Sequence, residues 1–101
     1  MPANSMSSRA DLRMALRSCL DSYGWRSRHD LTVQFGDRIS PQTAMREYLN
    51  TFKGAQKDQP MEDIDYDWAI WVGKGRIIRQ ALTSLKCERR GEGPDALYRL
   101  P

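Results

Sequence analysis

The chain has no long hydrophobic run. Its longest apolar stretch, Trp68–Val72, has five residues, whereas a helix that crosses a membrane needs about 20. The segment Met1–Ser8 is small and polar and does not contain the apolar stretch of a secretion signal. We therefore expect no membrane-spanning segment and a cytoplasmic location.

Residues that commonly bind metal ions are scarce. The 101 residues include two cysteines, Cys19 and Cys87, and a single histidine, His29. These residues do not have the short spacing that zinc ligands use. Without a secretion signal, the two thiols are expected to remain reduced rather than to form a disulfide. The carboxylates between residues 56 and 67 do not follow the spacing of a calcium loop, so the sequence predicts no metal site.

The motifs of common catalytic sites are also missing. There is no Gly-x-Ser-x-Gly nucleophile motif, and no glycine-rich loop is followed by Lys-Ser or Lys-Thr. The segments Gly73-Lys74-Gly75 and Gly91-Glu92-Gly93 are too short to count as either motif. We expect a protein without enzymatic activity, cofactor or small-molecule ligand.

What the sequence does have is an uneven distribution of charge. The net charge is only +3, from 16 Lys and Arg against 13 Asp and Glu, and this excess alone does not indicate a polyanionic partner. Residues 73–90, however, carry six cationic side chains against Glu88, a balance of +5. Residues 56–67 carry one lysine against five carboxylates, a balance of −4. The small total is therefore a cancellation, and the C-terminal third of the chain is basic.

Three segments show the three- and four-residue spacing of apolar residues that is typical of an amphipathic helix. The second of them follows Ser40-Pro41, a strong signal for a helix start. Glycines mark the ends of the first two, at Gly24 and Gly54. The predicted helices span residues 8–23, 41–53 and 74–86.

Two further segments are ambiguous. Residues 25–37 favour a short helix ended by Gly36, although Leu31, Val33 and Phe35 also alternate as in a strand. The apolar stretch Tyr66–Val72 fits either a helical turn that leads into the next helix or a short buried strand.

Glycine, proline and polar residues predict the remaining organisation. Residues 87–100 contain two short strand-like runs around a Gly- and Pro-rich loop, which is typical of a β-hairpin. Residues 55–67 are predicted to form an acidic loop, and residues 1–8 a disordered leader. The chain is then one domain, residues 9–101, mainly α with a small C-terminal β-hairpin.

The helix and hairpin at the C-terminus together resemble the end of a winged helix-turn-helix domain. In that family, a recognition helix leads into a strand, a Gly-rich wing and a returning strand. The matching residues here are Arg79, Ala81, Leu82 and Leu85 in the helix, Arg89–Asp95 in the wing, and Tyr98-Arg99-Leu100 in the returning strand.

The resemblance covers roughly residues 8–101. Upstream, Arg38-Ile39-Ser40-Pro41 is similar to the family's short first strand followed by its second helix. The implied fold has three main helices and a wing.

The resemblance implies sequence-specific binding to double-stranded DNA by a small transcriptional or replication regulator of bacterial or phage type. A helix fits the major groove, where Arg and Gln can make paired hydrogen bonds to guanine or adenine. Lysines at the helix ends suit phosphates. The predicted DNA-binding residues are Lys74, Arg76, Arg79, Gln80, Thr83, Ser84, Lys86, Arg89 and Arg90.

Two alternatives remain open. Residues 31–49 can also be interpreted as a helix-turn-helix, in which case the helix at 41–53 would be the recognition helix. It carries only Arg46 and Lys53 as cations, so the helix at 74–86 is preferred. The second alternative is a winged-helix protein-interaction or assembly module that does not bind DNA. Its interface, with another protein or a second copy of the chain, would be the aromatic segment 64–72 with Tyr66, Trp68 and Trp71.

Overall fold

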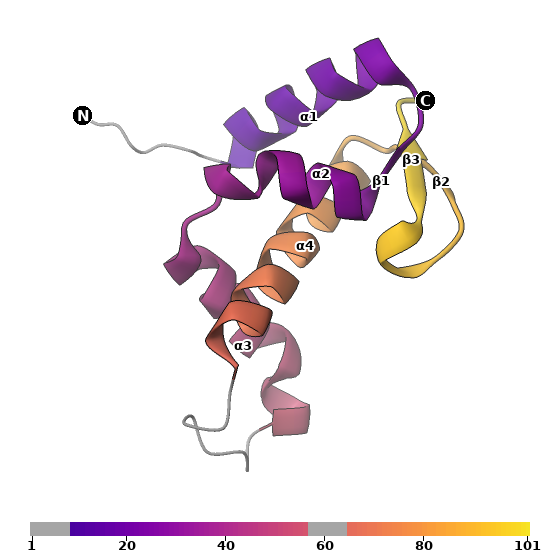
Figure 1. The fold of residues 1–101 in the computed structure, drawn as a ribbon. Coiled ribbons are helices and arrows are strands. Elements are labelled where there is room, and N and C mark those ends of the chain that lie inside the picture. The colour runs from indigo at the N-terminus through magenta and orange to yellow at the C-terminus, as the bar shows by residue number, and fades with distance from the viewer. Residues whose placement is uncertain (1–8, 57–64) are drawn as a thin grey trace, which may run out of the picture.

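A computed structural model of the chain describes the backbone of residues 9–56 and 65–101 and the side chains of residues 9–51 and 65–101. This part is mainly helical and carries one small antiparallel sheet (Figure 1). None of its helices is long and apolar enough to cross a membrane. In chain order the elements are α1 (Arg9–Tyr23), β1 (Arg26–Ser27), α2 (Arg28–Phe35), the 3-10 helix η1 (Gly36–Arg38), α3 (Pro41–Gln56), α4 (Tyr66–Ser84), β2 (Glu88–Arg90), the 3-10 helix η3 (Gly93–Asp95) and β3 (Leu97–Arg99).

Polar side chains fix the starts of three helices. Ser27, Ser40 and Asp65 each accept a hydrogen bond from the backbone N–H three residues later, at 3.0, 3.1 and 3.1 Å. Each bond satisfies an N–H group that has no partner inside the helix. The helix start at Ser40-Pro41 is therefore confirmed, and the short helix favoured for residues 25–37 is α2.

The predicted helix ends are confirmed at one glycine and wrong at another. After α1, Gly24 has a φ of 72°, and its N–H donates to the carbonyl of Leu20 at 2.9 Å, as expected of a helix C-terminus. Gly54 does not end α3, which continues to Gln56. A single glycine costs a helix only about 1 kcal/mol, so flanking residues can carry the helix through it.

The helix predicted at residues 74–86 is confirmed as far as Ser84, but it begins earlier, at Tyr66, in agreement with one of the two alternatives for Tyr66–Val72. Tyr66–Val72 is helical, and α4 runs without interruption from Tyr66 through Gly73 and Gly75 to Ser84. The described part of the chain has four α-helices, which are the three predicted main helices and the short helix α2. The predicted acidic loop is shorter than 55–67, because its ends belong to α3 and α4; residues 57–64 and the predicted leader 1–8 lie outside the described residues.

The C-terminus of α4 turns the chain into the hairpin. The N–H of Lys86 donates to the carbonyl of Thr83 at 2.9 Å, and the N–H of Cys87 donates to the carbonyl of Leu82 at 3.2 Å. This pair of bonds is the Schellman arrangement, in which one residue adopts a left-handed conformation. Here that residue is Lys86, with a φ of 59°. Helix and hairpin are thus joined by a tight, hydrogen-bonded turn.

The sheet joins the segment between α1 and α2 to the C-terminal hairpin. Its strand order is β1-β3-β2, with both pairs antiparallel. The predicted hairpin is confirmed as β2 and β3, but the predicted first strand at Arg38-Ile39 is wrong, because residues 36–38 form η1. The strand is Arg26–Ser27, which pairs with Tyr98 and Leu97. Two polar residues show no apolar alternation, so only their pairing reveals them as a strand.

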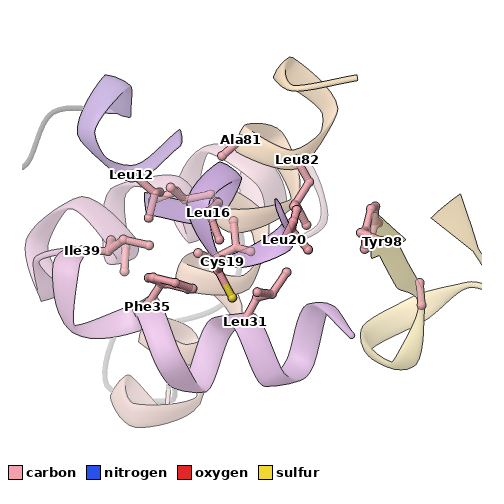
Figure 2. Close-up of a cluster of buried hydrophobic side chains, with 14 residues drawn as sticks. Leu12, Leu16, Cys19, Leu20, Leu31, Phe35, Ile39, Ala81, Leu82 and Tyr98 are labelled. Atoms are coloured by element: carbon pink, nitrogen blue, oxygen red, sulfur yellow. The ribbon is translucent and has the colours of Figure 1, made fainter. Parts of the chain in front are cut away.

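One hydrophobic core holds α1, α2, α4 and the sheet together (Figure 2). Leu16, Leu31, Ile78 and Leu82 are its largest fully buried side chains, and Tyr98 contributes from β3. The two cysteines are free thiols; Cys19 is buried in this core, and Cys87 is half-buried, which raises the pKa of its thiol.

A second, smaller cluster joins α3 to the first half of α4. Tyr48 and Ala69 are buried there, with Met45, Leu49 and Val72 packed against them. Figure 1 shows that α3 and the beginning of α4 project away from α1 and the sheet. The remaining half of α4, with the sheet and the start of α2, forms the other end of the molecule.

Candidate nucleic-acid interface

The second half of α4 exposes one row of polar side chains. Arg76, Arg79 and Thr83 follow one another at intervals of three and four residues, which places them on one side of the helix, and Lys86 follows them in the turn after Ser84. Arg79, Thr83 and Lys86 are exposed and Arg76 is half-buried. We call these four residues the basic stripe. The core side chains on other faces of α4 fix its orientation, so the stripe faces solvent.

Two of the predicted DNA-binding residues lie beside the stripe rather than in it. The side-chain amide of Gln80 donates to Glu47 Oε2 at 3.1 Å, and its oxygen accepts from Arg9 at 2.6 Å. Gln80 therefore connects α4 to α1 and α3, and its side chain is already engaged. Ser84, one turn later, is exposed on the same side of the helix as Gln80.

Lys74 is separated from the stripe. A Cβ built on Gly36 would lie 3.3 Å from the Cδ of Lys74, so the lysine stem covers Gly36 next to the end of α2. Lys74 is half-buried in this position. It contributes its charge at the α2 side of α4, away from Thr83 and Lys86.

The structure adds Arg28, which the sequence did not single out for this site. Thr32 of α2 lies next to Gly75 of α4, since a Cβ on this glycine would lie 3.9 Å from Thr32 Oγ1. Arg28 is one turn earlier in α2, and Arg79 is one turn later in α4. The charges of Arg79 and Arg76 both act on Arg28. We call Arg28, Arg76 and Arg79 the arginine cluster.

Burial and like charge both disfavour the cationic form of Arg28. Burial lowers its pKa most; the phenol of Tyr98 opposes this, and the charges of Arg79 and Arg76 lower the pKa further. An arginine nevertheless remains charged at neutral pH. Within the described side chains, no carboxylate forms a salt bridge with any member of the arginine cluster. The Nε of Arg76 is buried and has no hydrogen-bond partner. The cluster is thus a concentration of positive charge that the fold does not neutralise.

The two predicted DNA-binding residues of the hairpin, Arg89 and Arg90, lie on opposite faces of it. Arg89 is paired directly with Tyr98, and cross-strand partners point to the same face, so Arg89 lies on the same face as Tyr98, where it is exposed because β2 is the edge strand. Arg90 lies on the outer face, where its guanidinium is 4.7 Å from the ring centroid of Trp25. Arg99 contacts the same ring at 4.6 Å and bonds to Glu88 at 2.9 Å. The outer face therefore has a tryptophan with two cations, adjacent to β1.

The predicted aromatic interface lies at the other end of α4. Tyr66 is 53% exposed and Trp68 is 59% exposed, whereas Trp71 is half-buried and its ring contacts His29 edge-to-face at 5.4 Å. Tyr66 and Ile70 also line an open groove of about 560 Å³ between α3 and α4. These side chains are well separated along α4 from Thr83 and Lys86.

Neither the described metal-binding side chains nor the comparisons with known proteins indicate a function. Among the described residues, no three His, Cys, Asp or Glu side chains gather closely enough to hold a metal ion. No protein-family model, curated protein or solved structure matches the chain.

Proposed function

We propose that the protein binds double-stranded DNA as a small transcriptional or replication regulator of bacterial or phage type. In this proposal α4 lies in the major groove and the β2–β3 hairpin acts as a wing. The observation that carries the proposal is the basic stripe of α4, which meets Arg28 in a cluster of three arginines without carboxylate partners. Phosphates and the acceptor edge of guanine are ligands that unpaired guanidinium groups bind well.

The connectivity supports a winged helix-turn-helix fold for the same proposal. A short first strand, β1, leads into α2, and a long helix, α4, leads into a two-stranded hairpin. The returning strand β3 lies between β1 and β2. The family's expected arrangement accounts for these elements, and α3 is then an additional helix between the second helix and the recognition helix. Its presence explains the long separation in sequence between Phe35 and the basic stripe.

The choice of α4 over α3 as the recognition helix depends on charge. The described side chains of α3 include one cation, Arg46, whereas α4 and the turn after it present Arg76, Arg79 and Lys86 together. Binding to the DNA backbone depends on the number of phosphates that cationic side chains neutralise. We therefore place α4 in the groove.

The salt dependence of binding tests the proposal. If the six cations of residues 73–90 neutralise phosphates, the affinity for duplex DNA should fall with a log–log salt slope of roughly −5. Fluorescence anisotropy of a labelled duplex, measured at several NaCl concentrations, gives this slope. A protein that fails to bind duplex DNA even at low salt would refute the proposal.

A protein-interaction module is the second candidate, and a specific observation favours it. Tyr66 and Trp68 expose more than half of their surface in the first turn of α4, next to the groove between α3 and α4. Exposed aromatic side chains are frequent at protein interfaces. This surface would serve a partner protein or a second copy of the chain, with or without DNA binding at the other end of α4.

A further inference from the structure

We propose that the arginine cluster, Arg28 with Arg76 and Arg79, binds one phosphate group of the DNA backbone. This inference rests on the proposed binding of duplex DNA. It adds a contact from the start of α2, outside both the recognition helix and the hairpin. It also assigns that contact to the phosphodiester backbone rather than to a base.

The position of Arg28 is fixed by its backbone. Its N–H donates to the carbonyl of Ala96 at 3.0 Å, which attaches the start of α2 to the hairpin. Its carbonyl accepts from Thr32 Oγ1 at 2.8 Å. The backbone of Arg28 is therefore held at the start of α2 beside the hairpin, and its side chain is near enough to Arg76 and Arg79 for their charges to act on it.

The cluster is costly unless an anion occupies it. Arg28 is partly removed from water and is repelled by the charges of Arg79 and Arg76, and both effects disfavour its charged form in the folded state. An oxyanion reverses the sign of the interaction, because each guanidinium can donate charge-assisted hydrogen bonds to its oxygens. The buried Nε of Arg76 is a donor without a partner in the described structure. A phosphate has enough acceptor oxygens for all three residues, whereas a base edge offers two acceptors in one plane.

The test is the variant Arg28→Gln, which keeps most of the side-chain stem and removes the charge. Its log–log salt slope for duplex DNA should be shallower than that of the wild type by about 1, as for the loss of one phosphate contact. Its affinity should fall by a similar factor on any duplex sequence. The matched control is Arg17→Gln in α1, which removes an equal charge at an exposed position outside the cluster. An unchanged slope, or a loss confined to one sequence, would overturn the inference.

A second measurement separates this inference from the proposed function. Sodium phosphate should raise the melting temperature of the free wild-type protein more than NaCl of equal ionic strength does. This difference should be smaller for Arg28→Gln. If phosphate stabilises the wild type and the variant equally, the cluster does not bind phosphate. If the wild type shows the phosphate effect but does not bind DNA, the anion site stands and DNA binding fails.

The stability of the variant gives a further check. Because Arg28→Gln removes repulsion and leaves the backbone bond to Ala96 intact, its melting temperature without phosphate should equal or exceed that of the wild type. A clearly lower melting temperature would mean that the guanidinium is neutralised within the fold, and would contradict an anion site.

Discussion

Replacing Gly73 with alanine is expected to destabilise the protein by about 3 kcal/mol, the upper end of the usual cost of overpacking. A Cβ at this position would lie 1.9 Å from the carbonyl oxygen of Ala44 and 2.6 Å from its carbonyl carbon. Both atoms belong to the backbone of α3, so no side-chain rotation can relieve the overlap. The whole of α3 must shift, which disturbs the cluster around Tyr48 and Ala69. Thermal or denaturant unfolding measures the change.

Gly75→Ala is the matched control for this prediction. Gly75 lies in the same helix two residues later, and a Cβ there would meet only Thr32 Oγ1, at an ordinary 3.9 Å. Alanine is favoured over glycine in a helix interior by about 1 kcal/mol, so this variant should be as stable as the wild type or more so. Equal effects of the two substitutions would show that helix propensity, and not the α3–α4 contact, determines the result.

The double variant Arg76→Ala/Arg79→Ala should lose most of its affinity for duplex DNA. Each arginine in contact with DNA contributes about 1–3 kcal/mol. Neighbouring residues need not be additive, but a combined loss of about 2 kcal/mol already corresponds to a roughly 30-fold weaker complex. Fluorescence anisotropy at moderate, fixed salt measures the loss, with circular dichroism to confirm that the variant remains folded.

The matched control is Arg13→Ala/Arg17→Ala, which removes two arginines from α1. Arg17 lines a separate groove with Leu85 and Leu100 and does not belong to the basic stripe. The control should bind DNA much more tightly than the stripe variant, although both have lost two positive charges. Equal affinity of the stripe variant and the wild type would remove the basis for assigning the interface to α4.

The sequence predicted the elements that depend on local patterns. The spacing of apolar residues located α1 and the second half of α4, Ser40-Pro41 located the start of α3, and the Gly- and Pro-rich loop located the hairpin. These features arise from interactions between residues close in the chain, so they are visible in one sequence. The uneven charge distribution likewise identified most members of the basic stripe.

The features that the sequence did not predict depend on contacts between residues that are distant in the chain. The helix was predicted to begin at residue 74, but α4 continues through Gly73, the residue that allows α3 to approach α4 so closely. Strand β1 forms only because Arg26–Ser27 pairs with β3. Arg28 follows that strand directly, so its place beside Arg76 and Arg79 could not be predicted while the first strand was assigned to Arg38-Ile39. Charges from distant parts of a sequence meet only through the fold.

The most direct test of the DNA interface is a titration of the isotopically labelled protein with duplex DNA, followed through its backbone amide NMR signals. We predict that the largest chemical-shift changes fall on residues 76–90 and on the start of α2 near Arg28, with small changes in residues 41–50 of α3. Changes confined to residues 41–50 and 66–72, or no changes at a protein concentration high enough to saturate weak binding, would contradict this account.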